Sequence, residues 1–203
     1  MYKEMALGKN RVEALTDGIY AIAMTLGVLT IDVSELPAIP EGGHLINHLS
    51  VISPHIIHYA ITFFVLISFW MAQHRQMNHI RDVDAIYTWL NLVTLFFVAI
   101  VPFTTDLVGS YSEYPMAVTL YAGNLLMIGL LSSASWYYAT AGRRLVTDSI
   151  SKDRIQLFKA RGLSAPVVAI IVILYANFIS ASYSTILFLL IPLMKKIMIR
   201  IYR

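Results

Sequence analysis

The sequence contains no cysteine, which excludes disulfides, thiolate metal sites and cysteine nucleophiles. Charge is also scarce, because Asp, Glu, Lys and Arg make up only 13% of the 203 residues. A soluble globular domain usually carries about 25% charged residues. With 58% hydrophobic residues, the chain has too little polar surface to cover a water-facing globule. The composition therefore predicts an integral membrane protein.

Six apolar stretches are candidates for membrane-spanning helices, since each approaches the roughly 20 residues that a bilayer requires. They are residues 12–32, 52–73, 85–107, 115–138, 163–180 and 182–199. The last two leave little room for a turn, so one broken or tilted hairpin is an alternative there. No internal repeat or low-complexity linker divides the sequence. We therefore expect residues 1–203 to form a single all-α, multi-pass membrane domain.

Basic residues are absent from one side of the predicted membrane. If six helices are assumed, all fifteen Lys and Arg residues fall on the side of the two termini. The charged residues of the opposite side are all acidic: Asp32, Glu35, Glu41, Asp106 and Glu113. The positive-inside rule then predicts that both termini are cytoplasmic. Because topology accounts for the net charge of +3, we expect no nucleic acid partner.

The first predicted helix combines an apolar stripe with unusual polarity. At 100° per residue, Ile22, Leu26 and Leu29 fall on one stripe, and Thr25 and Asp32 lie on its flank. A stripe of this kind is most often a packing or lipid-contact surface. Asp17 points away from it. Because a short carboxylate cannot reach far toward the interface, this residue needs a partner inside the bundle.

Partners for Asp17 are available at the same depth on the next two helices. Trp70 and His74 lie four residues apart on one face of the second helix, and either side chain could bond the carboxylate. Asn91 adds an amide on the third helix. Polar residues at one depth on three helices predict a structural hydrogen-bond network.

These residues resemble those of a known family. The stretch "RVEALTD", residues 11–17, is similar to the Arg-x-x-x-Phe-Ser-Asp signature that opens the first helix of the lysosomal potassium channel family, transmembrane protein 175 and its prokaryotic homologues. The following "GIYAIAMTLGVLTIDV", Trp70-x-x-x-His74 and "LNLVTLFFVAIVPF" resemble the family too. The likeness covers roughly residues 1–110. A single six-helix unit matches the prokaryotic form, which implies the plasma membrane of a prokaryotic cell.

The resemblance implies a homotetramer in which four first helices line a pore for K⁺ and other monovalent cations. Carried over by position, the constriction falls on Ile22, with Leu26 and Leu29 further out. Thr25 then offers hydroxyls to a partly dehydrated cation, and Asp32 attracts cations at the outer mouth, although a solvent-facing helix end explains Asp32 equally well. The network implied by the family joins six residues: Arg11, Thr16, Asp17, Trp70, His74 and Asn91.

Two further absences bear on how such a channel would work. No Thr-Val-Gly-Tyr-Gly-like loop occurs, so a carbonyl cage is excluded as the selectivity filter. No helix carries regularly spaced arginines, which excludes an arginine-based voltage sensor. An apolar neck gates by dewetting. Because K⁺ holds its hydration shell less tightly than Na⁺, we expect modest K⁺ over Na⁺ selectivity without a cofactor.

Two other classes of function compete with the channel. A proton-coupled secondary transporter that uses an intramembrane Asp17–His74 pair is the alternative, since such pairs often mark proton relays. The sequence does not predict an enzyme, because it has no Gly-x-Ser-x-Gly elbow, and the helical i, i+4 metal-site spacing is missing from "HRQMNH". The outer-side histidines His44, His48, His55 and His58 are more typical of loop and interface residues than of a metal site.

Overall fold

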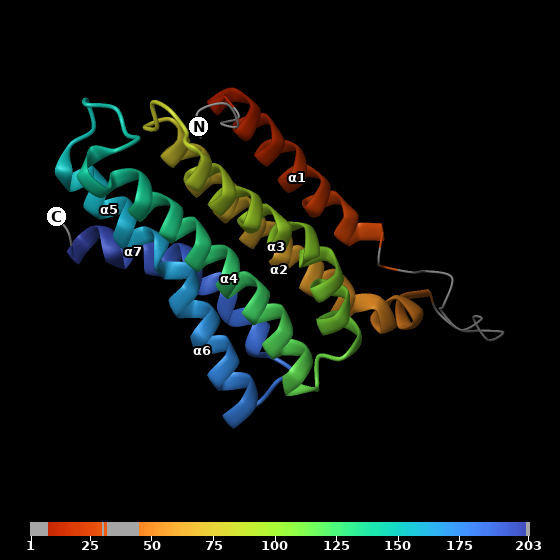
Figure 1. The fold of residues 1–203 in the computed structure, drawn as a ribbon. Coiled ribbons are helices and arrows are strands. Elements are labelled where there is room, and N and C mark those ends of the chain that lie inside the picture. Colours follow the sequence, from red (N-terminus) through yellow and green to blue (C-terminus); the bar gives the residue numbers. More distant parts are fainter. Residues whose placement is uncertain (1–7, 30, 32–44, 202–203) are drawn as a thin grey trace.

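The computed structural model is all-helical over the residues that it describes, which are 8–29, 31 and 45–201. Figure 1 shows a bundle in which α1 lies at one edge and α5 and α7 lie at the other. The elements are α1 (Lys9–Leu29), α2 (Leu45–Met77), α3 (Ala85–Ser110), α4 (Pro115–Thr140), η1 (Ala141–Arg143), α5 (Lys152–Gly162), α6 (Ser164–Phe178), η2 (Ser184–Leu190) and α7 (Ile191–Ile201).

Five stretches of the described chain are long and apolar enough to cross a membrane. They are Lys9–Leu29, Ile52–Met77, Ala85–Ser110, Pro115–Arg143 and Lys152–Phe178. Five of the spans expected from the sequence overlap these stretches. The largest difference is in the fifth, which was expected to begin at residue 163, whereas the stretch begins at Lys152. The protein is therefore a multi-pass membrane protein.

The sixth expected span, residues 182–199, is not one continuous α-helix. It consists of the 3-10 helix η2 followed by α7, which begins at Ile191. The break has a local cause. Pro192 cannot donate a hydrogen bond to the carbonyl of Phe188, and its ring would clash with that carbonyl in an α-helix. The prediction of a single α-helix here is therefore wrong, and the alternative of a broken hairpin with α6 describes the segment.

The connections that carry the basic residues meet at one end of the bundle, which we call the basic end (Figure 1). Lys9 Nζ, at the start of α1, donates to the carbonyl of Ile80 in the α2–α3 connection at 2.8 Å. The Arg81 N–H donates to the carbonyl of Leu145, beyond α4, also at 2.8 Å. Three segments far apart in sequence are thus tied together at this end.

Local capping explains where two helices begin at the basic end. Asp84 caps α3, since its carboxylate accepts a hydrogen bond from the Tyr87 N–H at 2.8 Å. The same carboxylate accepts a 2.6 Å hydrogen bond from the hydroxyl of Tyr138 on α4. Ser151 caps α5 through the N–H of Arg154. These caps fix the helix starts relative to the chain segments around them.

The main core fills the space between α1, α2, α3, α4 and α6. Its large, fully buried side chains include Tyr20, Leu66, Leu95, Tyr121 and Phe188. α4 packs extensively on both α3 and α6, whereas α1 packs mainly on α3 and α2. One face of α1 is consequently left uncovered within a single protomer.

The closest approach between α4 and α6 depends on a glycine. A Cβ atom placed on Gly129 would lie 2.7 Å from Cδ of Pro166, a rigid ring atom that cannot move aside easily. We expect Gly129→Ala to lower the free energy of unfolding by about 1–3 kcal/mol through overpacking. The measurement is the thermal unfolding of the detergent-solubilised protein.

Gly123→Ala on the same helix is the matched control, because nothing lies within 4 Å of the added methyl group. This variant should be neutral, or more stable by about 0.5–1 kcal/mol, since alanine favours the helix. Equal stability of the two variants would show that the contact between Gly129 and Pro166 does not limit packing.

Candidate functional site

The buried face of α1 is a continuous stripe that packs on the bundle. Its buried residues are Val12, Thr16, Tyr20, Ala23 and Gly27, at spacings of three and four residues, as expected of one helix face. A Cβ on Gly27 would approach Tyr59 of α2 to 2.9 Å, so glycine permits the tyrosine ring to lie close. This stripe fixes which side of α1 faces inward.

The apolar stripe predicted on α1 lies on the uncovered face. Ile22 is 57% exposed, Leu26 42% and Leu29 76%. Thr25 is exposed between them, and its hydroxyl donates to α1's own carbonyls, with Ala21 and Ile22 oxygens each 3.0 Å away. Because the single hydroxyl proton is used inside the helix, only oxygen lone pairs remain to face outward.

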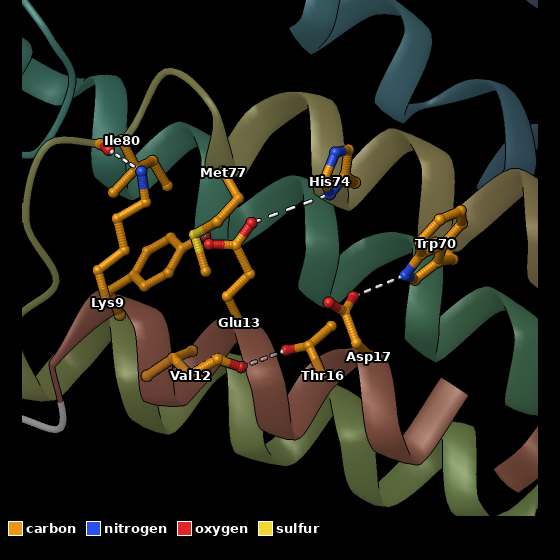
Figure 2. A network of polar contacts seen from close by, with 10 residues as sticks. Lys9, Val12, Glu13, Thr16, Asp17, Trp70, His74, Met77 and Ile80 are labelled. Atoms are coloured by element: carbon orange, nitrogen blue, oxygen red, sulfur yellow. Dashed lines mark hydrogen bonds and ion pairs between the residues drawn. The ribbon is translucent and has the colours of Figure 1, made fainter. Parts of the chain in front are cut away.

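The polar network ties α1 to α2 and α3 at one depth, as Figure 2 shows for α1 and α2. The Trp70 indole N–H donates to Oδ1 of Asp17 at 2.8 Å. The buried Thr16 hydroxyl lies 2.8 Å from the Val12 carbonyl and 3.2 Å from Oδ1 of Asn91 on α3. Between the two partners that were open for Asp17, the structure selects Trp70.

His74 has a different carboxylate partner from the one predicted. Its Nδ1 lies 3.9 Å from Oε1 of Glu13, which is an ion pair only when the imidazole is protonated. Its ring stacks on Trp70, with the centroids 5.6 Å apart. The predicted Asp17–His74 pair is therefore not formed, which weakens the proton-relay interpretation.

The contact between Glu13 and His74 is not among the sequence predictions, although helical spacing indicates it. α1 and α2 run antiparallel (Figure 1), so one turn back along α1 from Asp17 corresponds to one turn forward along α2 from Trp70. The i, i+4 spacing on both helices then aligns Glu13 with His74. Two parallel contacts, rather than one, join these helices.

The remaining predicted site residues take other positions. Arg11 is exposed, and its side chain has no partner in the part of the chain that the structure describes, so its place in the network is not seen within one protomer. Asp32 and His44 lie outside the described residues, as does the side chain of His48. Within the described ranges, no group of three or more His, Asp or Glu side chains is arranged to hold a metal ion.

The comparisons with known proteins match the part of the chain that contains this network. The family model described as the endosomal/lysosomal potassium channel TMEM175 matches residues 11–102. The solved structure of a Chamaesiphon minutus homolog of the lysosomal potassium-selective channel TMEM175 superposes with a TM-score of 0.77 and 25% identity. That match covers 94% of this chain and 97% of the other. Residues 11–102 match the TMEM175 family, and nearly the whole chain shares the fold of this homolog.

Bacterial and animal relatives differ in how much of their length this chain covers. A potassium channel of Chamaesiphon minutus is 29% identical over 148 residues, 71% of this chain and 72% of the relative. A potassium channel of Streptomyces collinus is 31% identical over 64% of each chain. The Bos taurus endosomal/lysosomal proton channel TMEM175 is 28% identical, but only 29% of its length is covered.

The hydrogen bond between Trp70 and Asp17 should hold α1 against α2. Trp70→Phe keeps an aromatic ring for stacking on His74 and removes the indole donor. We expect the free energy of unfolding to fall by about 0.5–1.5 kcal/mol, measured by thermal unfolding in detergent. Asp17→Asn keeps an acceptor oxygen but removes the charge that strengthens the bond, so it should cost less in the Trp70→Phe background, where the indole donor is already absent, than in the wild type.

Trp89→Phe on α3 is the matched control, since this side chain is 66% exposed and its indole N–H has no partner among the described residues. A Trp89→Phe variant as destabilised as Trp70→Phe would show that loss of indole area, and not loss of the hydrogen bond, is responsible.

Proposed function

We propose that the protein is a potassium-permeable cation channel of the cell membrane. The bacterial relatives named potassium channels support this function. The observation that carries it is the uncovered face of α1, where Ile22, Leu26 and Leu29 are exposed although the opposite face of the helix is well buried.

A homotetramer would give that face a role. One α1 helix cannot enclose a conduction path, whereas four copies around an axis would line one with their uncovered faces. The polar side chains on that side favour an aqueous environment over lipid, because Arg11 and Thr25 are exposed and a charge facing hydrocarbon is costly. The two termini and the basic end would then lie in the cytoplasm, following the positive-inside rule.

The proposed constriction is apolar and acts by excluding water. Side chains of Ile22 would form the narrowest ring, with Leu26 and Leu29 further out, and a narrow hydrophobic neck blocks conduction when it dewets. Such a ring offers no ligands to a dehydrated ion, so preference for K⁺ over Na⁺ would be modest. Thr25 lone pairs would supply the nearest polar contact, and carboxylates of Asp32 would attract cations outside.

The network between α1, α2 and α3 would act as the support of this pore. Asp17, Thr16 and their partners Trp70 and Asn91 fix the rotation of α1 about its own axis. A rotation of one residue position, about 100°, would turn Ile22 out of the proposed constriction. The network residues would thus determine the pore geometry without contacting the ions.

Proton conduction is a second candidate, favoured by the names of the animal relatives. The Bos taurus and Homo sapiens proteins are called endosomal/lysosomal proton channels. Flux should therefore be measured separately for K⁺, Na⁺ and H⁺. Flux that saturates with substrate and requires a pH gradient would instead favour a secondary transporter.

The test of the channel is ion flux through purified protein in liposomes. Wild type should pass K⁺ faster than Na⁺. Ile22→Asn should wet the neck, increase flux about tenfold if it removes a barrier of about 1.4 kcal/mol, and reduce the preference for K⁺. The result would locate the constriction and establish the permeant ion together.

Ile170→Asn on α6 is the control, because it places the same polar group on another exposed apolar position, 46% exposed and distant from α1 in the fold. Its flux and ion preference should match the wild type. Unchanged flux and selectivity in Ile22→Asn would remove Ile22 from the constriction, and an absence of cation flux in all three proteins would overturn the channel.

A further inference from the structure

A cavity of about 290 Å³ lies between α2, α5 and α7. Of these helices, α5 and α7 lie at the edge of the bundle away from α1 (Figure 1). Three cationic side chains, Arg75, Arg161 and Lys195, line the cavity, one from each of the three helices. They are close enough to repel one another. None of these three residues has a role in the pore proposed on α1.

The three cations lack anionic partners in the described part of the chain. Neither of the ion pairs found there includes them, and no carboxylate lines the cavity. Lys195 Nζ donates to the Ser68 hydroxyl and carbonyl oxygens. Arg161 Nε is buried without a hydrogen-bond partner. An anion in the cavity would supply the missing acceptor and relieve the repulsion.

Apart from Ser68 and Gln76, the rest of the cavity wall is apolar, and it extends toward the middle of the membrane. Phe64, Ile67 and Met71 precede Arg75 on one face of α2, and Pro192 faces them from α7. The eleven residue steps from Phe64 to Arg75 span about 16 Å along the helix, roughly half of the hydrocarbon thickness. Arg75 therefore lies toward the basic end, Lys195 reaches further in to Ser68, and the apolar wall runs beside and beyond it.

We propose that this cavity binds an anionic phospholipid. The headgroup phosphate would lie between Arg75, Arg161 and Lys195, and one acyl chain would follow the apolar wall of α2. Basic pockets between membrane helices on the cytoplasmic side suit such headgroups. A free phosphate would pair with the cations but would make no favourable contact with the three helical turns of apolar wall. A phospholipid fits both parts of the cavity.

The first experiment titrates the detergent-solubilised protein with dioleoyl phosphatidylglycerol and counts bound lipids by native mass spectrometry. Each cation near a lipid headgroup contributes about fivefold in affinity, so Arg75→Gln with Arg161→Gln should weaken binding about 25-fold. The matched controls are Lys196→Gln, next to Lys195 on α7, and Arg154→Gln on α5. Both residues are exposed outside the cavity lining, so their affinities should equal the wild type.

A second arm distinguishes the lipid from a free anion. Phosphatidylcholine should bind much more weakly than phosphatidylglycerol, and millimolar inorganic phosphate should not displace the bound lipid. Ala72→Phe, which fills the cavity wall without removing charge, should weaken phosphatidylglycerol binding while it leaves the three cations in place. These measurements use the unmodified cavity charges, so they remain informative even if the double variant does not fold.

Two outcomes would overturn the proposal. Equal phosphatidylglycerol binding by the cavity double variant and by the two control variants would remove the cations from the site. Displacement by phosphate, with no effect of Ala72→Phe, would make the cavity an anion site without a lipid. Binding is measured without ion flux, so the result does not depend on the proposed channel function.

Discussion

The position of α1 depends on the rule that polar groups inside a membrane must find partners within the protein. Asp17 and Thr16 cannot face lipid cheaply, and each finds a partner on a different helix, Trp70 on α2 and Asn91 on α3. Two bonds in different directions leave one rotation of α1 that satisfies both. The exposure of Ile22 and its neighbours follows from that rotation and not from any contact that they make themselves.

A second constraint acts at the basic end, where segments far apart in the sequence are joined by hydrogen bonds to backbone carbonyls. The Lys9 ammonium donates to the Ile80 carbonyl and the Arg81 backbone N–H donates to the Leu145 carbonyl, so the α2–α3 connection is tied both to the start of α1 and to the segment that follows α4. The cations of the cavity between α2, α5 and α7 belong to the same end but lack partners. The proposed lipid site would thus use basic residues that the other contacts at this end leave without anionic partners.

Much of this fold could be predicted because the lengths of the apolar runs and the positions of the charged residues can be read from the sequence. Helices α1 to α4 follow from runs of about 20 apolar residues, and the stripe on α1 follows from helical periodicity. The break at Pro192 was harder to predict, because a hydropathy profile does not show that proline lacks the backbone N–H that an α-helix requires. The pairing of Glu13 with His74 required the antiparallel alignment of two helices, and pattern reasoning on one helix at a time could not supply it.

The side chains on the uncovered face of α1 limit which ions this face can stabilise. The Thr25 proton is bound by carbonyls of its own helix, so the face offers lone pairs but no hydroxyl donor. Lone pairs stabilise cations and repel anions. Aliphatic groups of Ile22, Leu26 and Leu29 offer neither, so they act only through the cost of removing water. A conduction path built from this face would therefore separate cations from anions better than it separates one cation from another.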